Sequence, residues 1–179
     1  MFDVDTFIDD CVRAGAEDHP QLAVRDVLHR ELERPTAMAE ALQPQRAGIT
    51  RLHVSPELTI LHVVWAPGMH FGPHDHHMWA AIGIYSGGED NAFYRRDGET
   101  LTPSGGKELR PRDVALLGDD VIHAVTNPTT ELTGSIHIYG GDFFATPRSE
   151  WRGDPYREEP YDVERVLQYF EEANQAHRL

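Results

Sequence analysis

Between residues 49 and 140 the chain consists of short segments rich in β-branched and aromatic residues, with Gly, Pro, Asn and Asp between one segment and the next. Segments of this length and composition are typical of β-strands joined by turns. About eight of them follow one another without an intervening helical pattern, which favours a β-sandwich or barrel. The sequence therefore predicts an all-β core over residues 49–140.

Helices are predicted on both sides of this core. The apolar residues that recur at helical spacing near the start of the chain are Val4, Phe7, Ile8, Cys11 and Val12. Pro20 and Pro35 suit the first positions of two further helices, so residues 1–45 are expected to form a helical leader. After a loop expected over 146–160, Asp162 can cap a final helix within 161–177. The 179 residues are expected to form a single domain.

Charge and cysteine content narrow the possible partners. Sixteen Lys and Arg against 30 Asp and Glu give a formal net charge of -14, so neither nucleic acid nor a membrane surface is expected as a partner. The acidic beginning, MFDVDTFIDD, differs from a secretory signal, and no apolar run approaches the roughly 18 residues of a membrane span, so a cytoplasmic protein is expected. With Cys11 as its single cysteine, the chain must use nitrogen or oxygen ligands for any metal.

Three of the eleven histidines predict a metal site. His74 and His76 are two residues apart, so in an extended segment both imidazoles lie on one face. His123 lies in a later apolar segment, where an unpaired imidazole would be costly. Three neutral imidazoles suit Fe(II), Ni(II), Cu(II) or Zn(II). His77 is expected to point away from the pair.

The stretch from residue 68 to residue 127 resembles the two signature motifs of the cupin superfamily. The first motif appears as Gly68, His74, His76 and Gly88, with Ala81 where the family usually has Glu. The second appears in degraded form as Asp113, Gly118, His123 and Asn127. The resemblance implies a double-stranded β-helix, a jelly-roll barrel with N-terminal helices and a C-terminal helix. A three-histidine site without Glu is similar to the thiol dioxygenase branch, of which cysteine dioxygenase is the best known.

Two further features are similar to that branch. Its members carry a Ser-x-His-x-Tyr run beside the iron, which matches Ser135, His137 and Tyr139, although a strand that is merely amphipathic would show the same alternation. They also carry a substrate-binding arginine after a threonine, upstream of the histidine pair, which matches Arg51. Ile49 stands where cysteine-specific relatives have Tyr, so another mercapto-acid is expected to be at least as good a substrate as cysteine.

The resemblance implies a non-haem Fe(II) enzyme that oxidises a small carboxylate-bearing thiol to a sulfinate with O2. In this interpretation His74, His76 and His123 hold the iron, with Ni or Zn as alternatives in isolated protein. Tyr139 then hydrogen-bonds the reacting oxygen or thiolate, His137 orients the phenol, and Ser135 fixes the imidazole. Arg51 binds the substrate carboxylate. Two alternatives remain: another three-histidine cupin oxygenase or isomerase acting on a diketone or keto acid, and a metal-binding cupin without turnover. A monomer or homodimer is expected, and the sequence assigns no role to His77, Arg95 or Arg96.

Overall fold

The computed structural model describes residues 1–179 and contains four helices. They are α1 (Val4–Gly15), α2 (Pro20–Leu32), α3 (Pro35–Leu42) and α4 (Val163–His177). The predicted helix starts are confirmed: Asp162 accepts a hydrogen bond from the Glu164 backbone N–H at 3.0 Å, and Pro20 and Pro35 open α2 and α3. None of these helices is both long and apolar enough to cross a membrane.

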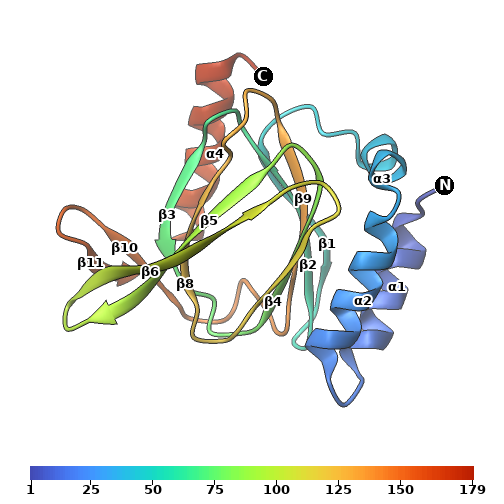
Figure 1. Cartoon of the computed structure of the whole chain (residues 1–179), viewed down its shortest axis with the longest axis horizontal. Coiled ribbons are helices and arrows are strands. Elements are labelled where there is room, and N and C mark those ends of the chain that lie inside the picture. The colour runs from blue at the N-terminus through green and yellow to red at the C-terminus, as the bar shows by residue number, and fades with distance from the viewer.

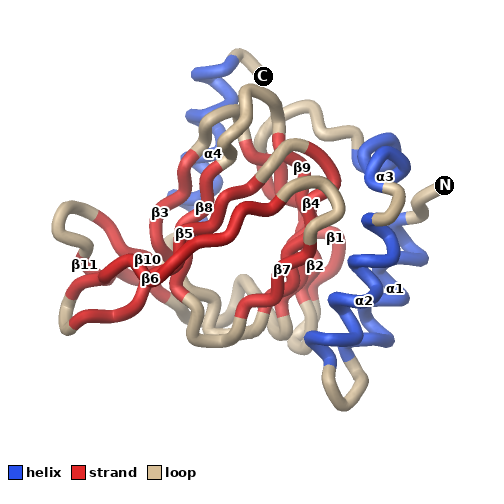
Figure 2. The backbone as a smooth tube through the Cα atoms, viewed as in Figure 1, coloured by secondary structure: helices blue, strands red, loops and turns tan.

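Eleven strands form two antiparallel sheets (Figures 1 and 2). The strands are β1 (Gly48–Val54), β2 (Thr59–Trp65), β3 (His70–His74), β4 (Ala80–Ser86), β5 (Glu89–Asp97), β6 (Thr100–Leu109), β7 (Val114–Leu117), β8 (Ile122–Thr126), β9 (Thr133–Tyr139), β10 (Ser149–Arg152) and β11 (Arg157–Pro160). One sheet has the order β1-β2-β9-β4-β7, and the other has the order β11-β10-β3-β8-β5-β6.

The order of the strands identifies the barrel. Strands β2, β9, β4 and β7 are neighbours in one sheet, and β3, β8, β5 and β6 are neighbours in the other. The chain therefore crosses repeatedly between the sheets, which is the connectivity of an eight-stranded jelly roll. This arrangement is the predicted double-stranded β-helix, with β1 added at one edge and β10 and β11 at another.

The prediction of a loop over residues 146–160 is wrong, because this segment contains the β10–β11 hairpin. This hairpin extends the sheet beyond β3, with Glu150 opposite His74. Most of its side chains are exposed and polar, so the segment lacks the alternation that marks a half-buried strand. Backbone pairing with β3, which depends on the tertiary structure, makes it extended.

The five-stranded sheet separates two apolar layers. Between the sheets lie the interior side chains, which include Leu61, Val63, Trp65, Ile82 and Ile84, and Phe170 of α4 packs against them. On the outer face, helices α1 to α3 lie beside the sheet (Figure 2). They cover side chains that include Ile60, Ala81, Ile136 and Ile138. Gly83 permits the close approach of α2, since a Cβ there would lie 2.6 Å from Leu32. Residues 135, 137 and 139 consequently face the barrel interior.

Candidate metal centre

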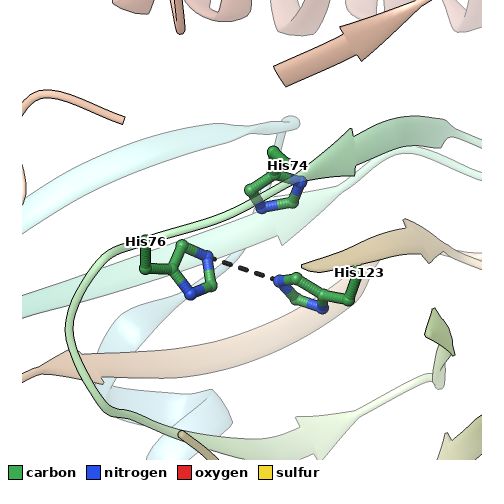
Figure 3. A group of neighbouring side chains, drawn as sticks. All are labelled: His74, His76 and His123. Atoms are coloured by element: carbon green, nitrogen blue, oxygen red, sulfur yellow. Dashed lines mark hydrogen bonds between the residues drawn. The ribbon is translucent and has the colours of Figure 1, made fainter. Parts of the chain in front are cut away.

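The structure brings the three predicted histidines together inside the barrel (Figure 3). His74 ends β3, and His123 lies directly opposite it on β8, so the pairing of these strands makes their side chains neighbours. His76 lies in the turn that follows β3. One ring nitrogen from each of the three lies within 4.8 Å of the others, and all three residues are buried.

Hydrogen bonds orient two of these rings. Nδ1 of His74 donates to the Gly72 carbonyl at 3.0 Å. Nδ1 of His123 lies 2.6 Å from Oδ1 of Asn91 and donates to it. An imidazole that carries its proton on Nδ1 keeps a lone pair on Nε2. Both rings therefore present an unprotonated nitrogen to the cluster.

The cluster fits a divalent transition metal ion. Nε2 of His76 lies 3.3 Å from Nε2 of His123, a separation that suits two ligands of one ion with bonds of about 2.0–2.1 Å to nitrogen. Nδ1 of His76 is buried and has no hydrogen-bond partner. Burial lowers the pKa of His74 to about 4 and holds the pKa values of His76 and His123 well below their usual range, so all three rings are neutral and available as ligands.

No carboxylate joins the three imidazoles. Ala81 occupies the position of the usual cupin Glu, and its side chain packs in the layer between the sheet and the helices. Ala80, its neighbour on β4, faces the barrel interior. A buried three-histidine group without an acidic ligand is therefore what this chain offers to a metal.

The β10–β11 hairpin, which the sequence did not predict, holds the turn between His74 and His76 in place. The Ser149 backbone N–H donates to Oδ1 of Asp75 at 2.8 Å, and the Asp75 backbone N–H donates to the Ser149 carbonyl at 3.1 Å. Residue His77 follows with a φ of 53° and a side chain that is 48% exposed. Its ring points away from the cluster, as the sequence predicts, and Nδ1 donates to the Pro147 carbonyl at 3.0 Å.

Ser135, His137 and Tyr139 lie side by side on β9 beside the cluster. Nδ1 of His137 is 3.2 Å from the Tyr139 hydroxyl, and Nε2 of His137 is 3.0 Å from the Ser135 hydroxyl. The centroid of the Tyr139 ring is 4.9 Å from that of His76. Burial raises the pKa of Tyr139 far above its usual value, so the phenol is protonated and can donate a hydrogen bond.

The structure does not bring Arg51 to the cluster. Arg51 lies on the edge strand β1 and is exposed, with its guanidinium carbon 3.7 Å from the centroid of the Phe144 ring. Ile49 of the same strand, and not Arg51, lines the cavity beside the histidines. A substrate-binding role for Arg51 stays a prediction from the sequence.

A different arginine is buried next to the site. Arg148 is 7% exposed, and its guanidinium carbon stacks 3.8 Å from the centroid of Phe143 and 4.0 Å from that of Tyr161. Nη1 donates to the Phe143 and Thr146 carbonyls, whereas Nε and Nη2 have no partner. Sequence reasoning missed Arg148 because it lies in the segment that was expected to be a loop.

Glu89 was missed as well. It begins β5, and its carboxylate is completely buried. Its oxygens accept hydrogen bonds from Trp65 Nε1 at 2.9 Å and from Asn91 Nδ2 at 3.1 Å, and lie 3.2 Å from His137 Nε2. The only sequence signal was an acidic residue directly after Gly87 and Gly88.

A small cavity adjoins the histidines. Its volume is about 30 Å³, and eleven of its fourteen lining residues are hydrophobic. Its polar lining residues are His74, His123 and His137, and Tyr139, Phe143 and Tyr161 form part of the remaining wall. A cavity of this size has room for about two water molecules. Any ligand that enters it is small and meets little bulk water.

Comparison with known proteins supports the fold. No protein-family model matches the chain. A solved protein from Bacillus halodurans is 17% identical, with a TM-score of 0.51 over 58% of this chain and 77% of its own. An RmlC-like cupin family protein with a double-stranded β-helix fold from Methanocaldococcus jannaschii is 11% identical, with a TM-score of 0.45 over 55% of this chain and 83% of its own.

The similar solved structures also include an enzyme, oxalate oxidase in complex with the substrate analogue glycolate. It is 14% identical, with a TM-score of 0.44 over 55% of this chain. The match spans 52% of that enzyme, about half of its length. At such identities the likeness concerns the cupin fold alone. The chemistry of this chain must be argued from its own residues.

Proposed function

We propose that the protein is a non-haem Fe(II) thiol dioxygenase that oxidises a small carboxylate-bearing thiol to a sulfinate. The observation that carries this proposal is the buried guanidinium of Arg148, which has two unpartnered nitrogens and stacks on Phe143 and Tyr161, two rings that line the cavity beside the histidines. The chain also resembles the thiol dioxygenase branch in its three histidines and in the run from Ser135 to Tyr139. This resemblance supports iron as the metal and thiol oxidation as the reaction.

Charge balance supports a doubly anionic substrate. Three neutral imidazoles leave the double positive charge of a bound ion uncompensated, and Arg148 adds a second positive centre in an apolar surrounding. Buried guanidinium donors without acceptors are costly, and a carboxylate can accept from two of them at once. A thiolate at the cluster and a carboxylate at Arg148 would neutralise both centres, whereas a diketone would supply no carboxylate.

Fe(II), when bound, would supply coordination positions at which thiolate and O2 meet, and would mediate electron transfer between them. In the reaction R–S⁻ + O2 → R–SO2⁻, sulfur loses four electrons and O2 gains four, so no further reductant is needed. Arg148 would hold the carboxylate and set the position of the sulfur. Tyr139 would donate a hydrogen bond to the reacting oxygen, and His137 and Ser135 would hold the phenol in place.

The size of the cavity supports a substrate of few atoms. Phe143 and Tyr161 separate Arg148 from the space beside the histidines, and both rings stack on its guanidinium. A mercapto-acid that spans from the cluster to Arg148 requires these rings to move apart. The same rings would exclude water from the bound substrate.

Oxygen consumption by iron-loaded protein tests the proposal. The panel is 3-mercaptopropionate, cysteine, cysteamine and acetylacetone, each with an assay for its oxidised product. We expect one O2 to be consumed per sulfinate formed, with 3-mercaptopropionate at least as good as cysteine. Uptake that depends on acetylacetone would support the diketone alternative instead. Metal binding without any uptake would contradict the proposal and leave a metal-binding protein without turnover.

A further inference from the structure

Glu89 is the one acidic side chain without any exposed surface. Its three partners come from both sheets: Trp65 from β2, His137 from β9 and Asn91 from β5. Neither Lys nor Arg pairs with this carboxylate, and His137 is its only ion-pair partner. A buried carboxylate is costly unless it is paired and hydrogen-bonded, so its position has consequences for each of these partners.

One branch of the network leads from Glu89 to a metal ligand. A carboxylate only accepts hydrogen bonds, so the NH2 group of Asn91 must face Oε1 of Glu89, 3.1 Å away. The amide oxygen of Asn91 then faces Nδ1 of His123 at 2.6 Å, and this nitrogen must carry the proton. Glu89 thereby fixes the side-chain amide of Asn91, and through it the tautomer in which Nε2 of His123 is free to bind metal.

The other branch leads to Tyr139. Ser135 donates its hydroxyl proton to the Val63 carbonyl at 3.2 Å, so it can only accept from His137 Nε2. Glu89 Oε2 also faces that nitrogen at 3.2 Å, and both acceptors require a proton on it. With its proton on Nε2, His137 turns Nδ1 toward the Tyr139 hydroxyl, 3.2 Å away. Glu89 and Ser135 thereby fix which side of the His137 ring faces Tyr139.

We propose that Glu89 is a positioning residue that sets two proton positions at once, one on the metal ligand His123 and one on His137 behind Tyr139. The role of the proton position on His123 depends only on the metal centre. The role of the proton position on His137 rests on the proposed function, in which Tyr139 donates to the reacting oxygen. Although burial raises the pKa of Glu89, the charge of His137 and the hydrogen bonds from His137, Asn91 and Trp65 outweigh it and lower the pKa, so the carboxylate stays ionised.

Two measurements that need no turnover test this role. The first is zinc affinity by competition with a chelator, and the second is the nitrogen-15 spectrum of the histidine rings in the metal-free full-length chain at neutral pH. In the unmodified protein we expect a proton on Nδ1 of His123 and a proton on Nε2 of His137. Glu89→Gln should weaken zinc binding about 10- to 100-fold, mix the two tautomers of His123 and reduce the proton occupancy of Nε2 of His137.

Two further variants separate a positioning role from a structural one. Asn91→Ala should weaken zinc binding to a similar degree but leave the proton on Nε2 of His137, because only the first branch is cut. Glu150→Gln is the matched control, since it removes another buried carboxylate, bonded to Arg165, and should change neither measurement. Near-ultraviolet circular dichroism of each variant reports whether the barrel is intact.

The proposal is overturned if Glu89→Gln keeps both the zinc affinity and the ring spectra of the unmodified protein. If that variant does not fold, the unmodified protein decides: the absence of a proton on Nε2 of His137, or a proton on Nε2 of His123, would overturn the proposal equally. Changes in both measurements in a protein that oxidises no thiol would support the positioning role and reject the proposed reaction.

Discussion

Arg148 and Phe143 are stacked, with the guanidinium carbon 3.8 Å from the centroid of the ring. The same ring lies 4.4 Å from that of Tyr139, which in turn lies 4.9 Å from the ring of His76. A cation, two aromatic rings and an imidazole of the metal centre therefore follow one another in contact. Each of these positions can be tested with a separate substitution.

Replacement of His74, His76 or His123 by Ala should abolish stoichiometric metal binding. Three ligands leave no redundancy, and a site of three ligands contributes less to folding than a closed one, so the β-sheet signal in circular dichroism should remain. Elemental analysis after dialysis against a metal-free buffer measures the effect. His77→Ala is the control and should keep its metal, because that ring points away from the cluster. A full equivalent of metal in His123→Ala would show that His123 is not a ligand.

Tyr139→Phe should lower kcat about tenfold or more while metal content stays unchanged. The substitution removes one hydroxyl, and with it the hydrogen bond that we propose Tyr139 donates to the reacting oxygen, at little change in volume. Steady-state oxygen uptake and elemental analysis on the same sample separate the two effects. Tyr94→Phe is a suitable control, since Tyr94 packs against Tyr156 away from the histidines. An unchanged kcat would mean that the polar face of β9 is structural.

Arg148→Lys should raise KM for 3-mercaptopropionate about tenfold or more and change KM for cysteamine little. Lysine keeps the charge but cannot present two parallel donors to a carboxylate, and cysteamine has no carboxylate. Arg51→Lys is the matched variant, because Arg51 also stacks on a phenylalanine but is exposed, whereas Arg148 is buried. If Arg51→Lys changed KM and Arg148→Lys did not, the assignment from the sequence would be right and ours wrong.

The metal-free protein should lose stability as the pH falls from about 6.5 to 4, partly because of His62. Burial lowers the pKa of His62 to about 4, and Nε2 is hydrogen-bonded to the Tyr85 hydroxyl at 2.7 Å. Above pH 6.5 the ring is neutral in both states and contributes no pH dependence. Below it the unfolded chain takes up a proton that the folded chain does not, which at pH 5 costs about 2 kcal/mol in free energy of unfolding.

Urea unfolding of the metal-free protein at pH 7.5 and at pH 5 measures this loss. His62→Gln removes the titrating group, so the variant should lose about 2 kcal/mol less than the unmodified protein between the two pH values. The comparison uses the change with pH, and the loss of the bond to Tyr85 therefore cancels. The same pH dependence in both proteins would show that His62 is not the group responsible.

Local patterns in the sequence determined the elements and the faces of their side chains. The alternation around Ile136 and Ile138 predicts which side of that strand is polar, because successive side chains of a strand point to opposite faces. The spacing of His74 and His76 predicts half of the metal centre for a similar reason, although His76 lies just beyond the end of β3. The position of His123 followed from a family motif, and its pairing opposite His74 is the structural reason for that motif.

Only the tertiary structure decided which residues complete the site. Glu89 faces His137 because β5 and β9, which belong to different sheets, meet across the barrel interior. The alternation of side chains along one strand gives no information about such a contact. Arg148 is buried because the chain folds back as a hairpin against β3, so that a polar segment predicted as a loop supplies a buried cation with two unpartnered nitrogens. Side-chain period is a property of a few consecutive residues, whereas contacts inside a closed barrel depend on how whole sheets pair and pack.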